Sequence, residues 1–175
     1  MSTRTPTAPA WPDQLYEVLR ANGYTQFAYV PDSGLKRIIE RATDDPDAIA
    51  LPLANEGEGV GIVTGCYLGG SRGVLLMQSG GVGNCVNYLS LVRHCAVPFL
   101  SVVTMRGDWG EQNPWQYPMG QAAEGVLNAI GVQTLPVHHA EEVAPTVEAA
   151  AGAVERAGRA VVILLSQRLL GVKKF

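Results

Sequence analysis

Charged residues are scarce in this sequence of 175 residues, where they make up 17% against 47% for hydrophobic residues. The formal net charge is -3, and lysine and arginine form no cluster. A protein that binds nucleic acid or an anionic membrane needs a basic surface, so neither is an expected partner. The low charge also suggests that other subunits cover part of the surface.

Long apolar runs and paired cysteines are missing as well. No stretch reaches the roughly 18–20 apolar residues of a membrane span, and the N-terminus lacks the charged-then-apolar pattern of a secretion signal. The three cysteines, Cys66, Cys85 and Cys95, have no CxxC spacing. We interpret them as reduced, buried thiols of a cytoplasmic protein. His138 and His139 have no carboxylate or cysteine at metal-ligand spacing, so we expect no metal site there.

Helical and strand patterns alternate along the chain, which is long enough for one domain with a single core. We expect a disordered tail at residues 1–10 and a folded domain at residues 11–175. The strands are near-continuous apolar runs, which is typical of a parallel sheet covered on both faces. The sequence therefore predicts a three-layer α/β/α domain with a mostly parallel, six-stranded sheet. Helices are expected at 11–22, at 35–42, from 55 onward, and at about 82–93, 121–130 and 140–157, and strands at 25–30, 48–53, 72–78, 97–104, 132–136 and 160–166.

The segment 51–70 combines a helical pattern with an unusual number of glycines. Asn55 is a good N-cap, and apolar residues recur after it at helical spacing. Each interior glycine costs about 1 kcal/mol relative to alanine, so we expect another backbone, helix or ligand to come very close. The interior glycines are Gly57, Gly59, Gly61 and Gly65.

A glutamate on the first turn of this helix, Glu56, has apolar residues on both sides. It is a candidate for a buried, working carboxylate. A first-turn glutamate more commonly complements the helix dipole, but Glu58 suits that role better.

Two short loops follow predicted strands, and ligands of parallel α/β folds bind at the carboxyl ends of the strands. Residues 78–84, QSGGVGN, lie between a strand and a helix as a phosphate-cradling loop would, but they lack its lysine. We interpret them as a close backbone approach to a ligand, and a simple tight turn is the alternative. Residues 31–34, PDSG, offer a helix N-terminus where Ser33 could hold an anion or only cap the helix.

A long irregular loop follows the fourth predicted strand, at residues 105–120. Loops of this length in compact domains are usually functional or mobile. Arg106 and Glu111 could bind substrate, pair with each other or pair with a partner chain. The aromatic residues Trp109 and Trp115 indicate an interface or a lid at least as strongly as a pocket.

Four motifs together carry a resemblance to a known family. They are PDSGLK at 31–36, ANEG at 54–57, QSGGVGN at 78–84 and RGDWGEQNPWQYPMG at 106–120. In this order they resemble the pyrimidine-binding (Pyr) domain of thiamine diphosphate enzymes. Within that family they are similar to alpha subunits of sulfopyruvate decarboxylase and to the corresponding part of phosphonopyruvate decarboxylase. The resemblance extends from about residue 12 to the end of the chain.

The resemblance implies a thiamine diphosphate-binding fold with Glu56 as the catalytic residue. In the family, the glutamate of the NEG motif hydrogen-bonds N1′ of the aminopyrimidine ring, which helps that ring to remove the thiazolium C2 proton. The implied contacts with the cofactor are at Pro31, Asp32, Glu56, Gly80, Gly81, Val82 and Asn84. The implied contacts with the substrate are at Ser33, Arg106 and Gln116.

One family motif is absent from this chain. Thiamine diphosphate enzymes hold the diphosphate and Mg²⁺ with a GDG motif in a separate domain, and the sequence contains no GDG. The resemblance therefore implies a beta subunit that binds the diphosphate and the metal. We expect a hetero-oligomer, α2β2 or larger, that is active only when both chains are present.

The implied reaction is decarboxylation of a small 2-oxo acid, phosphonopyruvate or sulfopyruvate, to the aldehyde and CO2. Phosphonopyruvate relatives read roughly QNSGLGN where this chain reads QSGGVGN, so a polar side chain near the expected substrate is missing and the identity of the acid stays open. Two alternatives remain: an acetolactate-synthase-like carboligase subunit, and a catalytically silent regulatory subunit. The retention of Glu56 argues against the silent subunit.

Overall fold

The strands of this domain form a single parallel sheet. The structure, a computed structural model, describes residues 10–172, so the expected disordered tail lies outside the described residues except for Ala10. The strands are β1 (Tyr24–Tyr29), β2 (Ile49–Pro52), β3 (Arg72–Gln78), β4 (Phe99–Thr104), β5 (Gln133–Val137) and β6 (Ala160–Leu165). Their order is β2-β1-β3-β4-β6-β5, and every neighbouring pair is parallel. The predicted six-stranded sheet is confirmed.

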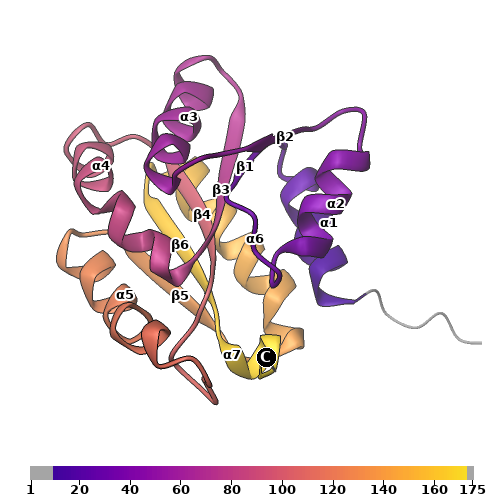
Figure 1. The fold of residues 1–175 in the computed structure, drawn as a ribbon. Helices are drawn as coiled ribbons and strands as arrows, with labels where there is room; N and C mark the ends of the chain where they lie inside the picture. Colours follow the sequence, from indigo (N-terminus) through magenta and orange to yellow (C-terminus); the bar gives the residue numbers. More distant parts are fainter. Residues whose placement is uncertain (1–9, 173–175) are drawn as a thin grey trace, which may run out of the picture.

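Helices cover both faces of the sheet (Figure 1). They are α1 (Trp11–Ala21), α2 (Lys36–Asp44), α3 (Glu56–Leu68), α4 (Val82–His94), α5 (Tyr117–Ala129), α6 (Ala140–Ala157) and the short α7 (Gln167–Leu170). One core cluster joins α1, α2 and α6 to the sheet, and a second joins α3, α4 and α5 to it. The three-layer prediction is therefore confirmed. In the part of the chain described, no helix has the length and apolar character to cross a membrane.

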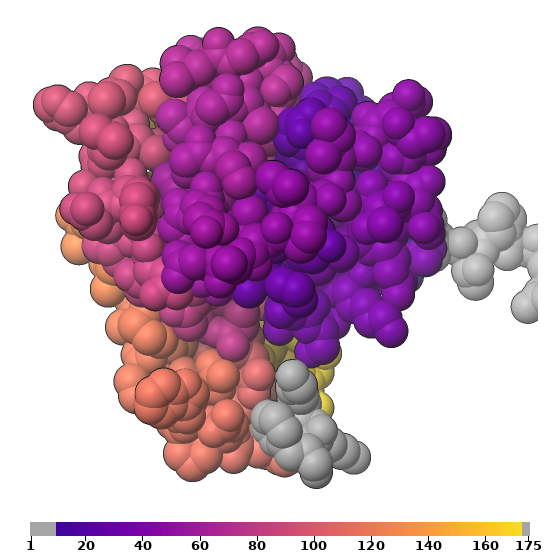
Figure 2. All heavy atoms as spheres, turned by 45° about the horizontal axis from the view of Figure 1, so that its top comes forward, coloured from indigo at the N-terminus to yellow at the C-terminus, as the bar shows by residue number. Residues whose placement is uncertain are grey.

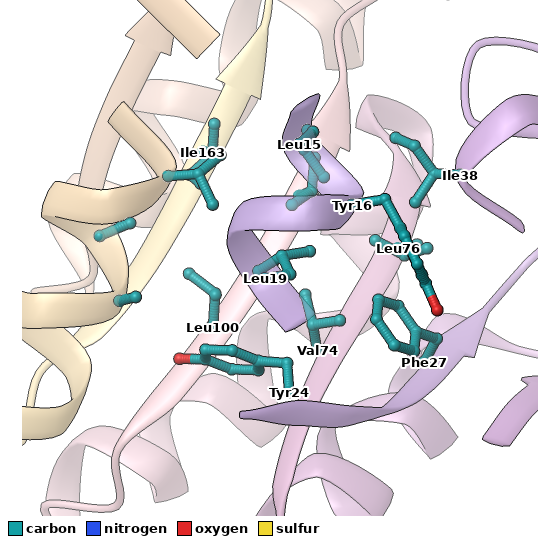
Figure 3. Close-up of a cluster of buried hydrophobic side chains, with 14 of the residues drawn as sticks. Leu15, Tyr16, Leu19, Tyr24, Phe27, Ile38, Val74, Leu76, Leu100 and Ile163 are labelled. Atoms are coloured by element: carbon teal, nitrogen blue, oxygen red, sulfur yellow. The ribbon is translucent and has the colours of Figure 1, made fainter. Parts of the chain in front are cut away.

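The central strand β3 shows why these strands read as continuous apolar runs. Val74 and Leu76 belong to the core cluster that also contains Leu15 of α1 (Figure 3). Leu75 and Met77 belong to the cluster on the opposite face. Because both faces are covered, successive side chains are buried whichever way they point.

Two elements near the carboxyl edge of the sheet differ from the prediction. The fifth helix begins at Tyr117 and not at residue 121, after a 3-10 turn at Pro114–Gln116. Pro118 lies in its first turn, where a proline is tolerated because the missing N–H has no helical partner there. The four-residue helix α7 is not predicted at all, because it is too short to show a period.

The prediction of Ser33 as a possible N-cap of α2 is wrong. That helix begins at Lys36, and no side chain caps it. Instead, the Asp32 carboxylate accepts a hydrogen bond of 3.0 Å from the Gly34 N–H and so closes the turn. Ser33 itself is exposed.

The cysteines are free thiols, but they are not all buried. Cys85 is buried, Cys66 is half-buried and Cys95 is exposed. The expectation is wrong for Cys95 because this residue forms the C-cap of α4 at the surface. Burial raises the pKa of the Cys85 thiol to about 12, and the charge of Glu56 adds to that effect.

The end of α4 contains a strained backbone position. Ala96 has φ of 52°, and among non-glycine residues in the described part it is alone in this left-handed region. The Val97 N–H bonds to the Val92 carbonyl and the Ala96 N–H to the Arg93 carbonyl. This is the Schellman arrangement, in which the position of Ala96 usually holds glycine.

Replacing this residue by glycine should stabilise the fold. We expect Ala96→Gly to raise the free energy of unfolding by roughly 0.5–1 kcal/mol, because glycine adopts left-handed φ without steric penalty. The matched control is Ala149→Gly, on the exposed side of α6, which should lower it by about 1 kcal/mol. Urea unfolding of the purified chain measures both, and a loss of stability in Ala96→Gly would contradict the argument.

Candidate functional site

All the sequence-predicted site residues follow the carboxyl ends of four strands. Residues 31–33 follow β1, Glu56 follows β2, residues 80–84 follow β3, and Arg106 and Gln116 follow β4. Because the strands are parallel, these ends meet at one edge of the sheet. Such an edge is where α/β folds bind ligands.

The first turn of α3 separates the roles of its two glutamates. The Asn55 side chain caps the helix by accepting a 2.8 Å hydrogen bond from the Gly57 N–H. The Glu58 carboxylate reaches back to accept from the Ala54 N–H at 3.2 Å. Glu58 therefore serves the helix terminus, as the sequence suggests, and Glu56 takes no part in capping.

Glu56 instead contacts the turn after β3. Its Oε2 accepts a 2.8 Å hydrogen bond from Nδ2 of Asn84, in the first turn of α4. A Cβ atom at Gly81 would lie 2.5 Å from Cδ and from Oε1 of Glu56. Glycine at position 81 therefore leaves the space that the Glu56 carboxylate occupies. The tight packing at this turn is thus a contact between two parts of the same chain. Glu56 is half-buried in the described chain, whereas a buried carboxylate is expected from the sequence.

The glycines of α3 fall into two groups. A Cβ at Gly59 would lie 2.3 Å from Cδ1 of Leu75, and one at Gly57 would lie 2.8 Å from Cε2 of Tyr88. The expected close approach is confirmed at these two positions, where the helix touches the sheet and α4. Gly61 and Gly65 differ, since a Cβ at either position would meet no atom of the described chain within 4 Å.

A second group of predicted residues lines a hollow of about 170 Å³. Asp32, Ser33 and Arg106 line it together with Thr104. The Thr104 hydroxyl donates to Asp32 at 2.8 Å, which ties the loop after β1 to the end of β4. The structure therefore brings two of the three predicted substrate residues to one hollow, whereas Gln116 does not line it.

Arg106 pairs with Glu111, one of the alternatives that the sequence left open. Nε and one terminal nitrogen of Arg106 donate to the two Glu111 oxygens at 2.6 and 2.7 Å. Both side chains are buried, with 9% and 1% of their surface exposed. Gln167 adds a 2.9 Å hydrogen bond to Glu111, and the Arg106 N–H donates to the Ser79 hydroxyl at 3.1 Å. This network fixes the start of the long loop against the turn that carries Gly81.

Gln167, Thr104 and Ser79 were not predicted from the sequence, although each has a polar side chain that is buried at the end of a strand. Thr104 and Ser79 directly end or follow predicted strands, so polarity at a strand end was the available signal. Gln167 offers the same signal, because it directly follows the last predicted strand, at 160–166.

The other predicted cofactor residues vary in accessibility. Gly80 donates its N–H to the Gln78 side chain, and Pro31 is exposed beside Asp32. Val82 is fully buried in the core cluster with Leu75. The prediction of Val82 as a cofactor contact is therefore not supported, since this residue has no exposed surface.

The carboxylate of Glu56 suits an aminopyrimidine ring. Of the described residues, only Asn84 hydrogen-bonds to it, and that bond is to Oε2. Oε1 therefore accepts no hydrogen bond from the described residues. No group of three or more histidine, cysteine, aspartate or glutamate side chains among residues 10–172 is placed to hold a metal ion.

Comparison with known sequences gives a consistent result. The chain is 36% identical over 121 residues to sulfopyruvate decarboxylase subunit alpha of Methanococcus maripaludis, covering 69% of this chain and 72% of that one. The same subunit of Methanocaldococcus jannaschii is 33% identical over 129 residues, covering 73% and 76%. Phosphonopyruvate decarboxylase of Streptomyces viridochromogenes is 35% identical over 108 residues, which is 61% of this chain and 27% of that enzyme. No model of a protein family matches the chain.

Comparison with solved structures identifies the fold. The chain superimposes on 2-oxoglutarate:ferredoxin oxidoreductase from Magnetococcus marinus with a TM-score of 0.76 and 14% identity, covering 97% of this chain and 33% of the other. Thiamine diphosphate-dependent 4-hydroxybenzoylformate decarboxylase of Rhodococcus jostii gives 0.71 and 18%, covering 90% and 30%. This chain thus corresponds to about a third of each longer chain, and the predicted Pyr-type fold is confirmed.

The contact between Gly81 and Glu56 can be tested on the isolated chain. Gly81→Ala should lower the free energy of unfolding by about 1 kcal/mol, because the new methyl group displaces the carboxylate and breaks its hydrogen bond with Asn84. Gly83→Ala is the matched control in the same segment, since its Cβ would meet Met119 at an ordinary 3.6 Å. Chemical denaturation of both variants measures the difference, and equal stabilities would refute the contact.

The Arg106–Glu111 pair predicts a defined pH dependence. The Arg106 guanidinium lowers the pKa of Glu111 from 4.5 to about 2. The folded state therefore favours the charged carboxylate, which contributes roughly 3 kcal/mol of stability above pH ~5 that is lost as the pH falls toward 2. In Glu111→Gln, stability at pH 7 should drop by about 3–5 kcal/mol, because the substitution breaks a buried ion pair, and the part of the acid dependence due to Glu111 should vanish. Unfolding curves between pH 3 and pH 7 measure the free energy of unfolding of the wild type and the variant.

The exposed Glu141→Gln is the control, and an acid dependence equal to wild type in Glu111→Gln would contradict the prediction.

Proposed function

This chain belongs to the family of sulfopyruvate decarboxylase alpha subunits, and we propose that it is the pyrimidine-binding subunit of a thiamine diphosphate-dependent 2-oxo acid decarboxylase. The observation that carries the proposal is the carboxylate of Glu56. It lies on the first turn of α3 at the carboxyl edge of the sheet, is held by Asn84 and is packed against Gly81. Asn55 and Glu58 accept the N–H groups at the start of the helix, so Glu56 takes no part in capping it.

In the proposed reaction, Glu56 holds a proton at N1′ of the aminopyrimidine ring. Asn84 fixes the orientation of the carboxylate through Oε2 and leaves Oε1 for the ring nitrogen. Gly81 leaves the space that the Glu56 carboxylate occupies beside the turn after β3, and Gly80, Pro31 and Asp32 are proposed as further contacts of the cofactor. Thiamine diphosphate, when bound, supplies the electron sink for the loss of CO2.

The diphosphate and Mg²⁺ are assigned in this proposal to a beta subunit. Support comes from the missing GDG motif and from the lack of a metal-binding cluster in the described residues. The active enzyme is then a hetero-oligomer of α2β2 or larger composition. A cytoplasmic location also belongs to the proposal, and the unpaired cysteines support it.

The proposed substrates are sulfopyruvate and phosphonopyruvate. Ser33 is exposed at the hollow that Arg106 also lines, so both can contact a substrate there. The positive charge of Arg106 is already matched by Glu111. We therefore assign most of the recognition of the sulfonate or phosphonate group to cations of the beta subunit, and the arrangement of the 105–120 loop to Arg106. Gln116 does not line this hollow. In the proposal it contacts the substrate where the beta subunit holds the substrate next to it.

The test uses the chain coexpressed with the product of the adjacent reading frame, the candidate beta subunit. With thiamine diphosphate and Mg²⁺, the purified pair should release aldehyde from sulfopyruvate or phosphonopyruvate, and neither chain alone should do so. Glu56→Gln should lower kcat by about 10²–10⁴-fold, because the proton at N1′ loses its carboxylate. An aldehyde-coupled assay measures each rate.

The matched control is Glu58→Gln, which changes a carboxylate in the same turn and should leave kcat unaltered. A hydroxyketone product in place of aldehyde would identify a carboligase. Equal activity of wild type and Glu56→Gln would identify a silent subunit. Either result would overturn the proposed function.

A further inference from the structure

An apolar groove of about 400 Å³ lies on the surface between α3 and α4. Figure 2 shows the face of the molecule on which these two helices lie side by side. No charged residue lines the groove. Four large side chains along it are strongly exposed: Leu68 by 75%, Leu91 by 61%, Tyr88 by 52% and Tyr67 by 50%. Exposed apolar patches of this kind mark surfaces that bind another molecule.

Two glycines on this face have no explanation within the chain. Gly61 lines the groove, and Gly65 lies one turn further along the same side of α3. A Cβ at either position would meet no atom of the described chain within 4 Å, and neither has a left-handed φ. Glycine in such positions weakens a helix without any local gain. The two positions fit a surface that another backbone or helix approaches from outside.

The groove is continuous with the Glu56 site. The helix α3 begins at Glu56, and α4 carries Asn84, which holds the carboxylate. Tyr88, one turn after Asn84, lines the groove and also lies against Gly57, beside Glu56. A molecule seated in the groove therefore contacts Tyr88, which lies against the residue next to Glu56.

We propose that this groove is the docking surface for the beta subunit, which packs an uncharged, apolar helix across Gly61 and Gly65. The inference rests on the proposed function, because that function requires a second chain beside Glu56. A second copy of this chain would bring another glutamate to the site, but no group of the described residues that could hold a metal ion. The beta subunit supplies what the site lacks, so it is the occupant we infer.

The test replaces both glycines by a larger helix-forming residue. In Gly61→Gln/Gly65→Gln, the isolated chain should keep or raise its unfolding midpoint, since the new side chains have open space and better helix propensity. Its affinity for the beta subunit should fall by about tenfold or more, because the partner helix can no longer approach closely. The control is Gly125→Gln on α5, another glycine with no atom within 4 Å of a Cβ, which should leave the affinity unchanged. Biolayer interferometry with the immobilised beta subunit measures the affinity of the wild-type chain, the double variant and the control.

Cys95 provides an independent readout because it is exposed and lines the groove. A maleimide followed by mass spectrometry should label Cys95 in the isolated chain and fail to label it in the complex. Wild-type affinity of the double variant, or equal labelling of Cys95 in both states, would overturn the docking surface. If the wild-type pair still produced aldehyde in that case, the proposed function would stand.

Two other outcomes would overturn the inference. One is a wild-type chain that does not associate with the beta subunit, a result that would remove the proposed function as well. The other is an isolated chain that forms a homodimer in which Cys95 is protected, because a second copy would then occupy the groove.

Discussion

The approach of α3 to the sheet determines where the carboxylate of Glu56 lies. At Gly59 the helix comes so near to β3 that even a methyl group would collide with Leu75, and α3 packs against β3 along its length. Since Glu56 precedes Gly59 by less than one turn, this packing fixes the depth and direction of the carboxylate relative to the turn after β3. The hydrogen bond from Asn84 then selects its rotamer. Gly57 and Gly59 lower the helix propensity of α3, but they allow the helix to pack closely against α4 and the sheet. This packing fixes the position of Glu56.

The buried pair of Arg106 and Glu111 has a similar role on the other side of the site. Compared with apolar residues of similar size, an ion pair with so little exposure adds little net stability, because desolvation offsets much of the attraction. Once the pair is present, it strongly disfavours any arrangement in which the charges separate. Together with the hydrogen bonds of Gln167 and Ser79, it selects one conformation for the start of the long loop. The long loop after β4 therefore begins as a rigid segment.

The parts of the structure that depend on local sequence were predictable. Strand β3 and helix α6 have the expected bounds, because a buried apolar run and a helical period can be read residue by residue. Helix-end chemistry favoured Glu58 for the helix terminus, whereas the role assigned to Glu56 rested on the family resemblance. The reason for Gly81 was not predictable, because it depends on a contact with Glu56, 25 positions earlier. The choice of Glu111 as the partner of Arg106 likewise depends on the folded path of the loop, and the exposure of Cys95 on where α4 ends.

The exposed groove between α3 and α4 has a consequence for the life of the chain before assembly. Leu68, Leu91, Tyr88 and Tyr67 face water in an unassembled copy, and uncovered apolar surface of this kind promotes aggregation and capture by chaperones and proteases. If the proposed beta subunit covers this groove, copies of the chain made in excess of that subunit would be exposed to this loss. Balanced synthesis of the two chains would then be favoured by the surface of this chain, independently of any need for equal numbers of active sites.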